Sequence, residues 1–201
     1  MSKKYIEYRG VEGLVIAKIT KDDAEGYTCD TPREFVGVSQ IEKSTEIGSE
    51  TKYYDNIPAI VITSESADEI TMNCSVPDLE TDAYITGKTY DESTGTYIDG
   101  DSEPGYFAAG YITKDTDGNK RYVWRYKGTL AKGAETSITE DDGTESNGVE
   151  YTYTGIKTTH KFTKGGNCKG IVVDESKGLA DLTGFFDKVT TPDDLKVKTQ
   201  G

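Results

Sequence analysis

The stretch of residues 105–130, GYFAAGYITKDTDGNKRYVWRYKGTL, places a polar turn containing Asp-Gly between two runs that are rich in apolar residues. In the second run, aromatic and basic residues alternate. Successive side chains of a β-strand point to opposite faces, so this alternation predicts a hairpin strand with one aromatic and one basic face. The aromatic face holds Tyr122, Trp124 and Tyr126, and the opposite face holds Arg121, Arg125 and Lys127. We expect the aromatic face to pack in the core.

Other segments also read as strands. Residues 14–20 and 68–76 are predicted as strands, the second with Ile70, Met72, Cys74 and Val76 facing inward. Residues 40–63 predict a long hairpin whose two arms flank the flexible Gly-Ser-Glu at 48–50. Its tip, EIGSETKYYDN, contains few apolar residues, so core burial alone cannot hold the hairpin in place.

Helical signals are sparse. Pro77 and Asp78 precede an acidic first turn, and Gly87 supplies a stop, so one helix is predicted between them. A second short helix is expected within residues 174–189. The chain is therefore predicted to be mainly β with one or two small helices, in a single domain of residues 1–201.

Composition narrows the function. The formal net charge is -13, which argues against binding a phosphate backbone, because that binding needs clustered cations. No secretion signal or membrane span is predicted. Cys29, Cys74 and Cys168 show no CxxC spacing, so neither a zinc site nor a disulfide framework is expected, and folding in a reducing cytoplasm is favoured. An apolar fraction of 34% is low for a self-sufficient core of this size.

Catalytic motifs are not evident. His160 is the only histidine and is expected as an exposed strand residue, since no GxSxG, HExxH or paired-carboxylate motif accompanies it. The DTDGN turn at 115–119 lacks the glycine and glutamate positions of an EF-hand loop. The acidic residues 135–150 are interpreted as a solvated loop. We expect no enzyme activity, no cofactor and no metal, and interpret the chemistry of the chain as association.

Three stretches together resemble the major tail proteins of long-tailed phages that infect Gram-positive bacteria, the subunits of the tail tube. They are AKITKDDAEGYTCDTPREFVGVSQIEKS, DEITMNCSVPDLETDAYITGKTYDESTGTYI and, as the most specific, the hairpin GYFAAGYITKDTDGNKRYVWRYKGTL. The segment GLADLTGFFDKV is similar to the closing segment of that family. The resemblance covers roughly residues 14–192 and is strongest in the central hairpin.

The resemblance implies two packed antiparallel β-sheets, as a sandwich or partly open barrel, with a flanking helix and a long hairpin at 41–62 that reaches a neighbouring subunit. It also implies hexameric rings stacked into a hollow tube. Residues 1–13 and 193–201 lie outside the resemblance and are expected as an N-terminal arm and a C-terminal tail. Expected partners are other copies, the tape measure, the tail terminator and the baseplate or distal tail protein. The expected location is the virion tail, made in the host cytoplasm.

On this resemblance, DNA passes through the tube without specific binding, and an acidic inner wall would keep it off the surface. Candidate residues on the hairpin, for the lumen or for contact between subunits, are Glu42, Glu46, Glu50, Tyr53, Tyr54 and Asp55. The acidic residues 141–145 could equally face outward. Arg121, Arg125 and Lys127 are expected to face acidic surface of an adjacent copy, or else to form a solvated strand face.

Two alternatives remain open. The inner tube of a contractile tail, or of a phage-derived injection particle, would share the fold and the self-assembly. A carbohydrate-binding β-sandwich is favoured by the content of Gly, Thr and Tyr, although no secretion signal is predicted and the long polar hairpin does not suit such a module.

Overall fold

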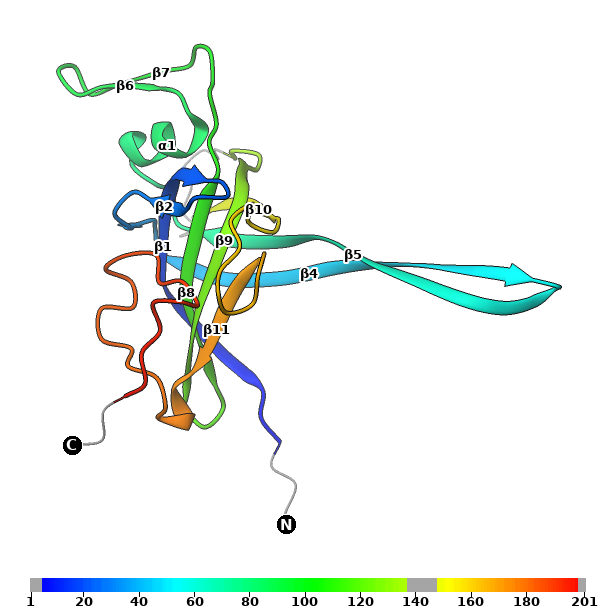
Figure 1. The fold of residues 1–201 in the computed structure, drawn as a ribbon. Helices are drawn as coiled ribbons and strands as arrows, with labels where there is room; N and C mark the ends of the chain where they lie inside the picture. The colour runs from blue at the N-terminus through cyan, green and yellow to red at the C-terminus, as the bar shows by residue number, and fades with distance from the viewer. Residues whose placement is uncertain (1–4, 137–147, 199–201) are drawn as a thin grey trace, which may run out of the picture.

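A computed structural model describes residues 5–136 and 148–198, and Figure 1 shows its arrangement. The chain is mainly β, as predicted, with one α-helix and one long hairpin. The elements in chain order are β1 (Tyr8–Asp22), β2 (Tyr27–Cys29), β3 (Arg33–Glu34), β4 (Val38–Tyr54), β5 (Ile57–Cys74), α1 (Leu79–Thr86), β6 (Thr89–Asp91), β7 (Thr96–Ile98), β8 (Phe107–Asp115), β9 (Lys120–Lys132), β10 (Val149–Gly155), β11 (Gly170–Asp174) and a 3-10 turn (Glu175–Lys177).

The large sheet has nine strands in the order β2-β1-β8-β9-β10-β5-β4, with β3 on β1 and β11 on β9. Strand β9 is where the sheet divides, because residues 121–125 pair with β11 and residues 128–132 pair with β10. The pairs are antiparallel, and the second sheet consists of β6 and β7 alone. The fold is sandwich-like, and the described residues form no closed barrel.

Apolar side chains pack on both faces of the large sheet. One cluster includes Ile16, Phe107, Tyr111 and Tyr153, together with Ile85 of α1. The opposite cluster is built around Trp124 and Tyr126, and the C-terminal part of the chain covers it with Phe162, Phe185 and Val189. The aromatic face of β9 therefore lies under a C-terminal segment that is largely irregular.

Hydrogen bonds fix this C-terminal cover. The Trp124 indole Nε1 donates to the carbonyl oxygen of Phe185 at 3.1 Å, and the Tyr126 hydroxyl donates to that of Thr190 at 3.0 Å. The second helix expected within residues 174–189 is reduced to the 3-10 turn Glu175–Lys177, followed by turns. Buried aromatic tips satisfied by main-chain carbonyls hold this segment without regular structure.

Helix α1 forms where its capping residues predict it. The Asp78 carboxylate accepts a hydrogen bond from the Thr81 backbone N–H at 2.7 Å, and Gly87 ends the helix at φ 70°. A Cβ on Gly87 would lie 2.3 Å from the backbone of Glu103, so only glycine fits this left-handed cap. No helix within residues 5–136 and 148–198 is long and apolar enough to cross a membrane.

The two expected terminal arms are partly integrated into the domain. Residues 8–13 belong to β1 and pair with the far end of β8, rather than forming a separate arm. Near the other terminus, the Asp193 carboxylate accepts hydrogen bonds from the backbone N–H groups of Thr163 and Lys164, and Val197 pairs with Ala180.

Candidate assembly surface

The long hairpin is the most distinctive surface of the molecule. Strands β4 and β5 pair from Val38 and Cys74 to Tyr54 and Ile57, so the hairpin is longer than the predicted 41–62. The strand predicted separately at 68–76 is mostly the base of β5, which ends at Cys74. Val76, predicted to face inward, lies beyond the strand and is exposed, which corrects that prediction. We call residues 46–66 the arm, because this part extends away from the sheet, as Figure 1 shows.

The predicted position of the turn is wrong. The chain reverses at Asp55 and Asn56, whose φ angles are 50° and 63°, while Gly48 continues in the ladder opposite Ser64. A two-residue turn with both φ angles positive suits the twist of a hairpin, and Asp and Asn tolerate that conformation better than most residues. The Asp-Asn pair at 55–56 therefore marks the turn of the hairpin, and Gly48 does not.

The arm carries exposed apolar side chains, which the prediction of a polar tip missed. Their exposed fractions run from 48% for Ile60 and Ile62 to 71% for Ile47. The full set is Ile47, Tyr53, Tyr54, Ile57, Ile60, Val61 and Ile62. Register places Ile60 and Ile62 on one face, opposite Lys52 and Glu50, and Val61 on the other face opposite Thr51. Apolar groups therefore meet solvent on both faces of the arm.

Both edges of the arm are open as well. Strand β4 is the last strand of the sheet, and β10 pairs with β5 only from Asp68 to Cys74. A two-stranded ribbon is only marginally stable in water, and open edges with apolar side chains promote pairing with other chains. The arm has the properties of a contact element.

Predicted acidic residues occupy different parts of the hairpin. Glu46 and Glu50 lie exposed on the arm, and Asp55 lies in its turn. Lys52 contacts Glu50 at 3.2 Å. Glu42 lies instead at the base of the hairpin, where β4 and β5 form part of the main sheet.

A buried carboxylate anchors the point where the arm leaves the sheet. Asp68, only 2% exposed, lies 3.1 Å from Lys43 Nζ, 2.9 Å from Lys169 Nζ and 3.8 Å from the Arg125 guanidinium. The Thr45 hydroxyl also donates to it at 2.8 Å. Burial on its own would raise the pKa of Asp68, but hydrogen bonds, first of all from Lys169, lower the pKa below its usual value.

The ladder is irregular at the same place. Thr45 pairs with Asp68 and Ile47 pairs with Glu65, so β5 carries one extra residue between these pairs. A bulge bends its strand, and Lys169 reaches across it to both Glu65 at 2.8 Å and Asp68. This anchor has no local sequence signal, because its residues come from four segments that are far apart in the chain.

Each of the three cations of β9 has an acidic partner within the chain, and their contact with an adjacent copy stays a prediction. Arg125 contacts Asp68, and Lys127 Nζ lies 2.6 Å from Asp22. Arg121 is held more loosely, 4.0 Å from Asp174 and 3.0 Å from the Tyr8 hydroxyl. The aromatic residues lie where predicted: Trp124 and Tyr126 are fully buried, and half-buried Tyr122 packs against the same cluster.

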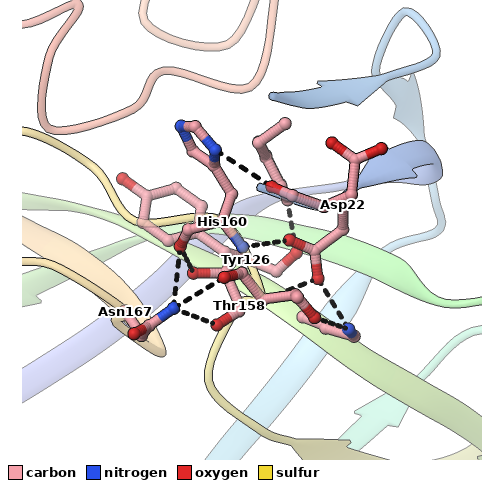
Figure 2. A network of polar contacts seen from close by, with 9 residues as sticks. Asp22, Tyr126, Thr158, His160 and Asn167 are labelled. Carbon is pink, nitrogen blue, oxygen red and sulfur yellow. Dashed lines mark hydrogen bonds and ion pairs between the residues drawn. The ribbon is translucent and has the colours of Figure 1, made fainter. Parts of the chain in front are cut away.

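Asp22 organises a second polar network, shown in Figure 2. Its carboxylate accepts hydrogen bonds from the backbone N–H groups of Thr159 at 2.9 Å and His160 at 2.8 Å, besides the ion pair with Lys127. Burial would raise the pKa of Asp22, but these contacts lower it. Asn167 completes the network by donating from Nδ2 to three carbonyl oxygens of residues 158–160.

His160 lies in this network rather than in a strand, which corrects its predicted position. The residue sits in a bend, is half-buried, and its Nδ1 lies 3.2 Å from the Asp23 carbonyl oxygen. Its ring packs edge-on against Phe162. These contacts connect the end of β1 with the loop that follows β10, so the network is a structural brace.

Burial and local hydrogen bonds account for the cysteines and for the β8–β9 turn. All three cysteines are free, and burial raises the pKa of both Cys29 and Cys74 to about 11, which disfavours the thiolate. The Asp115 carboxylate closes the β8–β9 turn by accepting from the backbone N–H groups of Asp117 and Asn119, each at 2.9 Å. Within the described residues, no three His, Cys, Asp or Glu side chains are grouped to hold a metal.

The acidic residues 141–145, considered as a possible lining of a lumen, lie outside the described residues. A scan against protein-family models matches no family, and a search of curated proteins finds no match.

Proposed function

We propose that this chain is the subunit of a phage tail tube and acts by self-assembly rather than by catalysis. The observation that carries the proposal is the arm, a paired ribbon with exposed apolar side chains on both faces and two open edges. The resemblance of the chain to major tail proteins, which is strongest in the β8–β9 hairpin, supports the same function. An arm of this kind is stabilised by contacts with other copies of the chain.

The energetics favour such contacts. Moving one large apolar side chain from water into an interface contributes roughly 1.5–3 kcal/mol. Seven large apolar side chains of the arm are at least 48% exposed in the isolated chain. Burial of these side chains in an interface would offset the translational and rotational entropy lost on association. The isolated ribbon cannot bury them against its own chain.

The proposal gives the acidic residues of the arm a role. A tube that conducts DNA needs a wall that does not hold a polyanion by releasing counterions, and a carboxylate-lined wall meets that need. Glu46 and Glu50 remain the candidates for such a lining, because they are exposed on the arm. Glu42, at the base, is the weaker candidate.

A shortened hairpin tests the proposal. Residues 48–64 are replaced by Asn-Gly, which joins the register partners Ile47 and Glu65 and preserves the Lys169 contacts at the base. The concentrated parent protein should form rings or tubes in negative-stain electron microscopy. The variant should remain a monomer that still unfolds in one cooperative transition when followed by circular dichroism.

Two results would contradict the proposal. One is tube formation by the shortened variant at the parental concentration. The other is a parent protein that stays monomeric at high concentration and binds a glycan, which would favour a carbohydrate-binding module.

A further inference from the structure

A groove of about 660 Å³ lies beside the base of the long hairpin. Residues from β1, β4, β8, β9 and β11 line it, and its apolar floor includes Val11, Ile41, Tyr111 and Val123. Val172 and Tyr8 stand at its border, exposed by 53% and 72%. The volume lies in the range of sites that enclose a few side chains or one small molecule.

The groove is cationic in a strongly acidic chain. Its described lining contains Arg9, Lys43, Arg121 and Arg125, but only one carboxylate, that of Glu42. The whole chain, by contrast, has a formal net charge of -13. This concentration of positive charge favours an acidic occupant.

These cations are incompletely neutralised within the chain. Across residues 5–136 and 148–198, Arg9 has no ion-pair partner, and the buried Nε–H of Arg125 donates no hydrogen bond. Lys43 and Arg125 share the single carboxylate of Asp68 with Lys169. The groove thus has positive charge available for another molecule.

We propose that the groove receives the tip of the arm, residues 53–57, from a second copy of the chain. This assignment rests on the proposed self-assembly and names its acceptor surface. The tip offers exposed Tyr53, Tyr54 and Ile57 for the apolar floor, and the carboxylate of Asp55 for the cations. The apolar side chains and the charge of the tip therefore complement those of the groove.

The chain's own tip does not reach its groove. The arm starts a few residues beyond the groove-lining residues 39–43, and Figure 1 shows that it extends away from the sheet. The strand from Ile47 to Tyr54 has a length of roughly 25 Å. A contact between the tip of one copy and the base of the next joins two different surfaces. Such heterologous contacts repeat into closed rings or open stacks rather than stopping at a dimer.

A photo-reactive phenylalanine analogue in place of Tyr54 tests the assignment. Isotope-labelled and unlabelled chains are mixed, assembled and irradiated, and the linked peptides are mapped by mass spectrometry. Links from one copy should reach residues 8–11, 39–43 or 121–125 of another copy. The same probe at Tyr106, at the opposite end of β8, is exposed by 46% and should not mark these segments.

The possible outcomes test the groove assignment separately from the proposed function as a tube subunit. Tubes in which the Tyr54 probe marks a different surface would overturn the groove assignment and leave the tube subunit standing. Links only within one chain would also overturn it. A protein that never assembles would contradict both the groove and the proposed function.

Charge reversal supplies a second test. The double variant Arg9→Glu and Arg121→Glu should weaken assembly by about tenfold or more at low salt, and less at high salt, where screening is stronger. Lys161→Glu with Lys164→Glu is the matched control, since it makes the same charge change on an exposed loop. Equal effects of the two double variants, or no effect of the first, would overturn the assignment.

Discussion

The hairpins β8–β9 and β4–β5 are both long and antiparallel, yet only the first has its apolar run covered by its own chain. In β8, Phe107, Ala108, Ala109 and Tyr111 are at most 4% exposed. In the arm, the corresponding run of Ile60, Val61 and Ile62 is 48–62% exposed. Similar sequence patterns thus have opposite environments within one molecule.

The difference lies in what each hairpin packs against. The run in β8 has Ile16 and Tyr153 on one face and the cluster of Trp124 and Phe185 on the other. Consecutive apolar residues are typical of a strand buried on both faces. The arm has the same kind of apolar run, but its own chain does not cover it. The run is therefore suited to burial on both faces by other chains, as proposed.

The largest expected effect on the stability of the monomer is in the covered hairpin. Trp124→Ala removes a fully buried side chain and its hydrogen bond to Phe185, and should lower the free energy of unfolding by about 3–5 kcal/mol. Urea denaturation at a concentration that keeps the chain monomeric measures this. A loss below 1 kcal/mol would mean that the C-terminal cover is not packed as described.

The junction between the sheet and the arm should show the next largest effect. Asp68→Asn leaves Lys43, Lys169 and Arg125 without their shared carboxylate and should lower stability by about 2–3 kcal/mol, since the lysines and the arginine remain partly solvated. Asp174→Asn, at the loose contact with Arg121, is the matched control and should change stability far less, since the contact is solvated. Equal losses would contradict the anchoring role.

Acid should weaken the same junction. The folded-state pKa values of Asp68 and Asp22 lie below the ordinary aspartate value of 3.8. Their contribution to stability is therefore complete above about pH 5 and is lost as pH falls through the lowered folded-state values. Urea midpoints between pH 7 and pH 2.5 should fall more in the parent than in Asp68→Asn. Parallel pH profiles would contradict this contribution from Asp68.

The sequence predicts local features well and distant ones poorly. Helix α1 follows from Asp78 and Gly87, which cap it locally, and the β8–β9 hairpin follows from its alternation. The turn at residues 55–56 was missed because Gly48 is also a plausible turn residue. The Asp68 anchor could not be predicted, because its partners are up to 101 residues away in the chain. The alternation in β9 likewise does not show which carboxylates of the chain will pair with its basic face.

The arm should show the smallest effect on monomer stability and a large effect on assembly. Ile60→Ser with Ile62→Ser changes two side chains that contact no core, so unfolding of the monomer should change by less than about 0.5 kcal/mol. Ser49→Ala with Thr51→Ala is the control on the opposite face of the arm. Sedimentation velocity should show that the isoleucine variant needs a higher concentration to assemble than the control does. If both variants assemble as the parent does, the exposed isoleucines contribute nothing to association. The exposure of the arm would then be a feature that the fold tolerates, with no role in assembly.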